Sequence, residues 1–221
     1  MNTNKIKILI IGHGFVGKAV DYGFSHPNVD KTIIDPKYKT SLKDIKLINL
    51  LGYNCIFVCV PTPMGSNGSV DASIVGGVLA QLKNIKDAPI VLKSTVPPDI
   101  IKIWKDKTNL VYNPEFLTEK SAQEQFVNPQ FQVLGGDRKY TDQVQDYYEK
   151  YSLCNPCPYL HMTTEEASFV KYSINTFLAT KVTFFNQLYD AVKDTNANFT
   201  TIIKAVGMDS RIGSSLSLIH I

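Results

Sequence analysis

The sequence lacks the long hydrophobic run that a membrane-spanning helix needs. No apolar stretch approaches the ~20 residues that cross a bilayer. The N-terminal MNTNKIK has neither the apolar core nor the cleavage pattern of a signal peptide. Charge of one sign is also scarce, since the formal net charge is +3 and no Lys/Arg cluster is interleaved with aromatics. We therefore expect a cytoplasmic protein that binds neither a membrane nor nucleic acid.

Cysteine is scarce as well, with four in 221 residues. Cys55 and Cys59 fall inside an apolar strand pattern, which favours buried thiols over a disulfide framework. Cys154 and Cys157 form a lone Cys-x-x-Cys without the second pair that a zinc site would need. The four histidines are dispersed and show no ligand spacing. We expect no metal site.

Short apolar runs alternate with helical patterns, which is typical of parallel strands joined by crossover helices. Several runs are continuously apolar, as expected for strands covered on both faces. The sequence therefore predicts an α/β fold with a doubly wound parallel sheet. Expected strands are 7–11, 32–35, 55–60, 90–94, 110–112 and 131–134. Expected helices are 14–24, 71–84, 119–126 and 137–151.

The residue pattern changes at Thr163. Up to residue 196 there is neither Gly nor Pro, and apolar residues recur at helical spacing. Thr163 or Thr164, followed by Glu165 and Glu166, supplies an N-terminal cap with favourable charge. We predict one long helix over 163–196 and a shorter one over about 200–206, which ends at Gly207.

A glycine pattern opens the first predicted helix. Gly12, Gly14 and Gly17 form Gly-x-Gly-x-x-Gly directly after the strand 8–11. In this context the glycines allow a tight turn and a close approach to a pyrophosphate at the helix N-terminus. Asp35 closes the second strand, where an acid hydrogen-bonds the adenosine ribose and repels a 2′-phosphate. This pattern predicts a Rossmann-type fold that binds NAD rather than NADP; the alternative is a glycine-rich turn beside a surface aspartate.

Further motifs follow in a fixed order along the chain. They are CVPTP at 59–63, NGSVD at 67–71, KSTVPP at 93–98, YNPEFLTE at 112–119, VLGG at 133–136, KYSINTFLA at 171–179, FFN at 184–186 and GMDSRIG at 207–213. In these motifs the chain resembles the UDP-glucose/GDP-mannose dehydrogenase family over residues 5–213. Several multi-residue motifs in the right order are far more specific than the glycine pattern alone.

The resemblance implies an activity. Enzymes of this family oxidise the primary alcohol of a nucleotide sugar, most often UDP-glucose, to a carboxylate. They use two NAD molecules and a cysteine that holds the intermediate as a thiohemiacetal and then a thioester. By resemblance, Thr95 would position a water beside the nicotinamide, and Glu115 would be the base for thioester hydrolysis. Lys171 and Asn175 would stabilise the oxyanion.

The resemblance also implies binding residues and domains. The expected cofactor-binding residues are Gly12, Gly14, Phe15, Val16, Gly17, Asp35, Pro61, Thr62, Thr95 and Glu119. The expected substrate-binding residues are Phe116, Leu117, Glu119, Lys171 and Asn175. Residues 1–160 would form the NAD-binding domain and 161–213 a central helical domain, followed by an atypical tail at 214–221. The long helix would be the core of a homodimer.

The long helix supports part of this from its spacing alone. Lys171 and Asn175 are one turn apart, and Asn186 falls within about 60° of Lys171 around the helix axis. These polar groups share one stripe of an otherwise apolar helix. The alternative is a solvated face.

The chain departs from the family pattern after Gly213. There the family continues into Gly-Gly-x-Cys-x-Pro-Lys-Asp, which supplies the nucleophilic cysteine, whereas this sequence continues SSLSLIHI. We therefore expect a truncated enzyme that is inactive alone for lack of its thiol. One alternative is a non-catalytic NAD-binding and dimerisation module. Another is a hydroxyacid dehydrogenase of related fold that uses Lys171 with Asn175, which the NPEFL motif and the context of Thr95 disfavour.

Overall fold

The computed structural model describes residues 5–38 and 50–215. The chain divides into two compact units, Met1–Lys171 and Tyr172–Ile221. Most of the tail expected at 214–221 lies outside the described residues.

The first unit is built on a seven-stranded sheet in the order β2-β1-β3-β4-β5-β6-β7. The strands are β1 (Ile6–Ile11), β2 (Val29–Ile34), β3 (Cys55–Val58), β4 (Ile90–Leu92), β5 (Leu110–Tyr112), β6 (Gln132–Gly136) and β7 (Tyr159–Met162). All neighbouring pairs are parallel except β5 and β6, where Val111 pairs antiparallel with Gly136. The expected doubly wound α/β sheet is confirmed, with β6 reversed.

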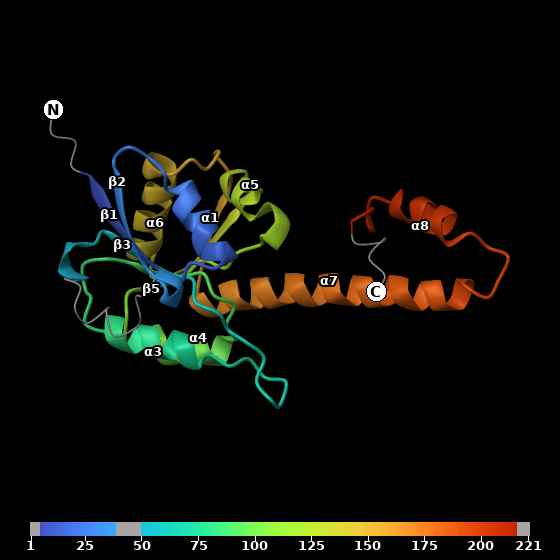
Figure 1. The fold of residues 1–221 in the computed structure, drawn as a ribbon, viewed down its shortest axis with the longest axis horizontal. Helices are drawn as coiled ribbons and strands as arrows, with labels where there is room; N and C mark the ends of the chain where they lie inside the picture. The colour runs from blue at the N-terminus through green and yellow to red at the C-terminus, as the bar shows by residue number, and fades with distance from the viewer. Residues whose placement is uncertain (1–4, 39–49, 216–221) are drawn as a thin grey trace. The chain divides into compact units, whose positions relative to one another are not determined.

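Helices cover both faces of this sheet (Figure 1). One layer contains α1 (Phe15–Gly23), α5 (Ala122–Val127) and α6 (Arg138–Tyr151), and the other contains α3 (Ser73–Leu82) and α4 (Pro98–Trp104). Side chains on alternate positions of each strand enter opposite cores. In β1, Ile8 and Ile10 pack with the α1 layer, whereas Leu9 and Ile11 pack with the α3 layer. The continuous apolar runs of the sequence follow from this double cover.

Two elements were not predicted from the sequence. The helix α4 begins at Pro98, a residue that suits a first helical turn, and its seven residues are too few to show a period. The strand β7 is short and mostly half-buried, as expected of a strand at the end of the sheet order. The segment expected as one helix at 119–126 is a 3-10 turn, Glu119–Ser121, followed by α5.

The long helix α7 runs from Thr164 to Val192, and α8 spans Phe199–Gly207. Thr163 and Glu166 form a capping box before α7: the Thr163 N–H donates to Glu166 Oε2 at 2.7 Å, and the Glu166 N–H donates to Thr163 Oγ1 at 3.2 Å. This confirms the predicted cap at Thr163. Within the described ranges, no helix is both long and apolar enough to cross a membrane.

Candidate functional site

The glycine loop joins β1 to α1 and is packed tightly against the sheet. Gly12 has a φ of +90°, and a Cβ there would lie 2.6 Å from the Cys59 carbonyl oxygen. A Cβ at Gly17 would lie 2.0 Å from the carbonyl oxygen of Gly12. Only hydrogen fits at either position. A Cβ at Gly14 would instead meet no atom of the described residues within 4 Å, so among these residues the loop is open on the side that Gly14 faces.

The N-terminus of α1 is left free to bind an anion. Its N-cap is Gly14, and no described side chain caps the first turn or places an acid there. The first backbone N–H groups of a helix have no intrahelical partner, and the helix dipole favours negative charge beside them. A pyrophosphate fits this cradle, with open space at Gly14 to admit it.

Asp35 lies at the carboxyl end of β2 and is tied to the glycine loop. Its Oδ2 accepts the backbone N–H of His13 at 2.6 Å, and its Oδ1 accepts the backbone N–H of Lys37 at 2.8 Å. The buried ring of His13 contacts the Tyr38 hydroxyl at 2.8 Å and Asp21 at 3.2 Å. The carboxylate is therefore held in a fixed orientation beside the loop.

A cavity of about 460 Å³ lies at the carboxyl ends of β1 to β5. Its lining residues are Gly12, Gly14, Phe15, Val16, Asp35, Cys59, Val60, Pro61, Thr62, Lys93, Ser94, Thr95 and Glu115. Most of the expected cofactor residues are brought together here. Gly17 lies behind the loop as a packing position, and Glu119 is exposed on its 3-10 turn and does not line the cavity.

Glu115 and Lys171 form a nearly buried ion pair at the wall of this cavity. Lys171 Nζ lies 3.3 Å from Glu115 Oε1 and also donates to the backbone carbonyl of Glu115. The other carboxylate oxygen, Oε2, accepts the backbone N–H of Leu117 at 2.6 Å. Lys171 Nζ also lies 5.2 Å from the centre of the Phe116 ring. The structure thus joins four of the expected site residues, from the β5 exit and α7.

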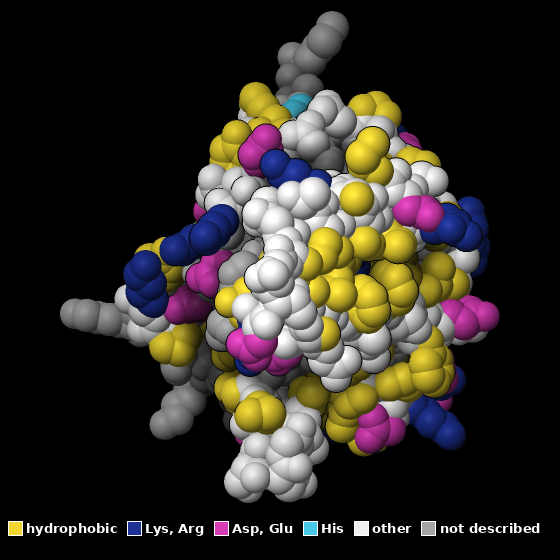
Figure 2. Space-filling view, turned by 90° about the vertical axis from the view of Figure 1, so that its right-hand side faces the viewer, with side chains coloured by type: hydrophobic (Ala, Val, Ile, Leu, Met, Phe, Trp, Pro, Cys, Tyr) yellow, Lys and Arg dark blue, Asp and Glu magenta, His cyan; other side chains and the backbone are white. Residues whose placement is uncertain are grey.

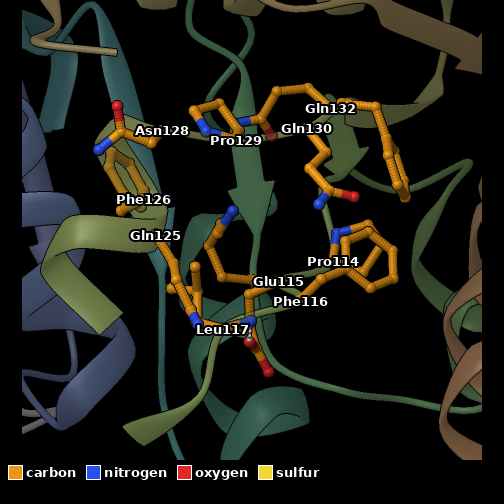
Figure 3. Close-up of a pocket in the computed structure, with 12 residues that line it drawn as sticks. Pro114, Glu115, Phe116, Leu117, Gln125, Phe126, Asn128, Pro129, Gln130 and Gln132 are labelled. Carbon is orange, nitrogen blue, oxygen red and sulfur yellow. Dashed lines mark hydrogen bonds between the residues drawn. The ribbon is translucent and has the colours of Figure 1, made fainter. Parts of the chain in front are cut away.

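Glu115 also lines a second cavity, together with Phe116, Leu117 and Lys93 (Figure 3). Lys93 follows β4 and is 3% exposed, although our sequence reasoning gave it no role. The signal was available, because a lysine that directly continues a buried apolar strand must place its ammonium in the protein interior or in a cavity.

The thiols are poor nucleophiles in their present surroundings. Burial raises the pKa of Cys59 to about 12 and that of Cys154 to about 11. Desolvation also raises the pKa of Cys55 and of Cys157. Cys59 lines the cavity, yet its side chain is nearly buried. A thiolate is the reactive form of cysteine, so none of the four is activated here.

Asn175 and Asn186 belong to the second unit. Asn175 is exposed on α7, and its side chain makes no hydrogen bond within the described part of the chain. Asn186 Oδ1 is buried and without a partner among the described residues. The oxyanion role of Asn175 therefore remains a prediction.

The fold and this site define a Rossmann-type dinucleotide-binding protein. Residues 48–152 match the NAD-binding domain of the UDP-glucose/GDP-mannose dehydrogenase family, and residues 165–219 match its central domain. The chain belongs to this family, and its cofactor is NAD. The resemblance stated from the motifs is confirmed.

Similar proteins agree with this assignment. The chain is 30% identical over 241 residues to a UDP-glucose 6-dehydrogenase of Campylobacter jejuni, covering 94% of this chain and 61% of that protein. It is 34% identical over 169 residues to a UDP-glucose 6-dehydrogenase of Rickettsia felis, covering 72% of this chain and 38% of that protein. A UDP-glucose dehydrogenase structure from Pyrobaculum islandicum shares the fold, with a TM-score of 0.78 and 24% identity over 98% of this chain and 60% of that one. The chain thus spans less than two thirds of these relatives.

Proposed function

We propose that this chain contributes the NAD-binding and part of the catalytic machinery of a nucleotide-sugar 6-dehydrogenase that oxidises UDP-glucose to UDP-glucuronate. The observation that carries the proposal is the cavity that joins the glycine loop and Asp35 to Thr95 and to the Glu115–Lys171 pair. Its two ends suit the two halves of the task, which are binding the dinucleotide and handling protons at the sugar.

The dinucleotide would be bound from the loop side. The free N–H groups at the start of α1 hold the pyrophosphate, and the fixed carboxylate of Asp35 accepts hydrogen bonds from the adenosine ribose. NAD supplies the hydride acceptor of the reaction. Thr95, on the cavity wall after β4, holds a water near the reacting carbon.

The Glu115–Lys171 pair would transfer protons and stabilise the charge that develops on the substrate. The ammonium of Lys171 stabilises the oxyanion that develops at the oxidised carbon of the sugar, because a preorganised cation needs no rearrangement during the reaction. The carboxylate of Glu115, oriented by the Leu117 N–H, accepts a proton from the attacking water. Phe116 and Leu117 then border the sugar.

The second oxidation needs a thiol that the four cysteines of this chain do not provide. All four have a raised pKa and are protonated at pH 7. We therefore expect the 221-residue chain to bind NAD but to form no carboxylate product, the uronate, from UDP- or GDP-sugars. Turnover that disappears in Cys59→Ser would contradict this assignment of Cys59. Turnover with small hydroxyacids instead would favour a hydroxyacid dehydrogenase.

The chain would also self-associate through α7. Phe177 and Phe184 are 67% and 54% exposed and are seven residues apart, so they lie on one face of the helix. Figure 2 shows hydrophobic side chains gathered near the centre of one face of the molecule. Exposed apolar surface of this kind is typical of interfaces. Light scattering that reports only monomer at tens of micromolar would contradict self-association.

The assignment to NAD can be tested by the ratio of two affinities. Calorimetry is expected to show tighter binding of NAD than of NADP to the 221-residue chain. Asp35→Ala should weaken NAD binding by about 1–3 kcal/mol and bring the NAD/NADP ratio toward one, because the ribose donor loses its acceptor. The exposed Asp87→Ala is the matched control. Equal affinities in the unmodified chain would overturn the proposal, and the ratio separates specificity from any general damage to the loop.

A further inference from the structure

The second cavity of the first unit has a volume of about 270 Å³ and lies beside the exit of β5 (Figure 3). One wall is formed by the segment from Pro114 to Leu117, and the other by residues 125–132. Aromatic rings and prolines provide much of the surface, with amide side chains between them. Of the described residues that line it, Lys93 and Glu115 also line the dinucleotide cavity.

Lys93 brings a nearly buried ammonium to this cavity. Its Nζ donates one hydrogen bond, to Asn113 Oδ1 at 2.9 Å, and lies 5.7 Å from the centre of the Phe126 ring. Within residues 5–38 and 50–215, no carboxylate lies within ion-pair distance of it, and its other two N–H groups have no acceptor. Asn113 is itself occupied, because Oδ1 also accepts the Tyr148 hydroxyl and Nδ2 donates to Gln132.

The groups around Lys93 leave this positive charge unmatched. Glu115 is the carboxylate that faces it, and Glu115 is already paired with Lys171 and the Leu117 N–H. The thiols of Cys59 and Cys154 also face it, and both are neutral at pH 7 because their pKa values are raised. The two ammonium groups of Lys93 and Lys171 are therefore balanced by one carboxylate, that of Glu115. Desolvation accordingly lowers the pKa of Lys93 to about 8.

Gln132 provides a second unused donor in the same cavity. The residue is 7% exposed, and its Oε1 accepts Asn113 Nδ2 at 3.0 Å. Its Nε2 donates to no described residue. Because the Gln132 amide is fixed through its oxygen, its N–H₂ group is presented to the cavity. The Lys93 ammonium beside it has two N–H groups without an acceptor among the described residues.

We propose that this cavity is a binding site for a small oxyanion, a carboxylate or a phosphoryl group, held by Lys93 with Gln132 as the second donor. A charge-assisted hydrogen bond in a partly desolvated site is strong, and an anion offsets the cost of the buried ammonium. The volume admits such a group with a small substituent. The cavity shares Glu115, Phe116 and Leu117 with the proposed sugar site, but anion binding by Lys93 and Gln132 needs neither NAD nor turnover, so it can fail independently of the proposed function.

The experiment titrates the full 221-residue chain with inorganic phosphate and, separately, with glucuronate, using calorimetry without NAD at pH 7. Binding of at least one probe is expected, and the stronger probe shows whether the site prefers a phosphoryl or a carboxylate group. Lys93→Met should weaken that binding about tenfold or more, whereas Lys102→Met, at an exposed lysine of α4, should leave it unchanged. The affinity of the unmodified chain should fall as pH rises through about 8, where Lys93 loses its proton.

Gln132→Glu keeps the test decisive if Lys93→Met fails to fold. The new carboxylate would pair with Lys93 inside the cavity, so anion binding should be lost while the protein melts at an equal or higher temperature. Absence of binding of both probes to the unmodified chain at tens of millimolar would overturn the proposal. Equal binding by the Gln132→Glu or Lys93→Met variant would overturn it as well. NAD titration of the same samples reports separately on the proposed function.

Discussion

The two units of the chain bury their apolar side chains to very different degrees. In the first unit both faces of the sheet are covered, and most large apolar side chains on the strands are fully buried. Among the described residues of the second unit, only Phe185 and Ile203 are buried hydrophobics, while Phe177 and Phe184 stay mostly exposed. The sheet unit therefore contains its own stabilising core, whereas the helical unit presents a surface suited to contact with another protein.

The largest difference in stability is expected when one phenylalanine of each unit is separately replaced by alanine. Phe57 is fully buried in β3 between Phe24 and Tyr148, so Phe57→Ala should lower the free energy of unfolding by about 4 kcal/mol. Phe177→Ala should change it by less than about 0.5 kcal/mol in the monomer and weaken self-association. Denaturant titrations at several protein concentrations measure both. If Phe57→Ala and Phe177→Ala lowered the free energy of unfolding equally in dilute protein, the proposed difference between the two units would be wrong.

The next effect concerns close packing in the glycine loop. Gly17→Ala would place a Cβ 2.0 Å from the Gly12 carbonyl oxygen, so it should cost about 3 kcal/mol of stability and disrupt NAD binding. Gly14→Ala is the matched control, because its Cβ meets no atom of residues 5–38 or 50–215 within 4 Å and should leave stability within about 0.5 kcal/mol. It should still weaken NAD binding by filling the cradle. Thermal unfolding and calorimetry separate the two effects; a stable Gly17→Ala would refute the tight turn.

Lys93 is a buried lysine of the first unit that, unlike Lys171, has no carboxylate within ion-pair distance among the described residues, so its effect on stability should depend on pH. Its folded pKa of about 8 lies below the unfolded value of about 10.4, so the unfolded state binds more protons between these values. The ammonium therefore destabilises the fold most below pH 8. Lys93→Met should be more stable than the unmodified chain by about 2 kcal/mol at pH 7, and the difference should vanish near pH 10.5. Urea titrations at both pH values, with Lys102→Met as control, measure it; a difference independent of pH would contradict the buried charge.

The smallest effect is expected at the start of α7. Thr163→Ala removes the side chain that accepts the Glu166 N–H and should cost about 1 kcal/mol. Thr176→Ala, at an exposed position within the same helix, should be neutral or slightly stabilising, because alanine has the higher helix propensity. Denaturant unfolding followed by circular dichroism compares the pair. Equal destabilisation would show that the cap contributes nothing.

Much of the sheet could be predicted because its strands are continuously apolar and bounded by turns. The strand over 110–112 matches β5 to the residue, and Thr163 marks the cap of α7. The reversal of β6 could not be predicted, because an apolar run carries no information on strand direction. The helix α4 is too short to show a period, and β7 has too little burial to give a clear pattern.

The same limit applies to the site. Gly12, Asp35 and Thr95 could be placed together from the sequence, since the carboxyl ends of parallel strands share one edge. The burial of Lys93 could be inferred from its place directly after an apolar strand, but its lack of an ion-pair partner could not, because that depends on which charges are absent around it. That is a property of side chains from four separate segments and leaves no spacing in the sequence.

The reversal of β6 has a consequence for how specificity can change. Because β6 runs against β5, its first residue, Gln132, lies near the exit of β5, and the connection 128–131 lines the second cavity. Connections between elements tolerate insertions and deletions better than the strands that they join. A change of length in 128–131 would reshape the second cavity without moving the glycine loop or Asp35, which directly follow β1 and β2. Ligand preference and cofactor binding can therefore evolve separately in this fold.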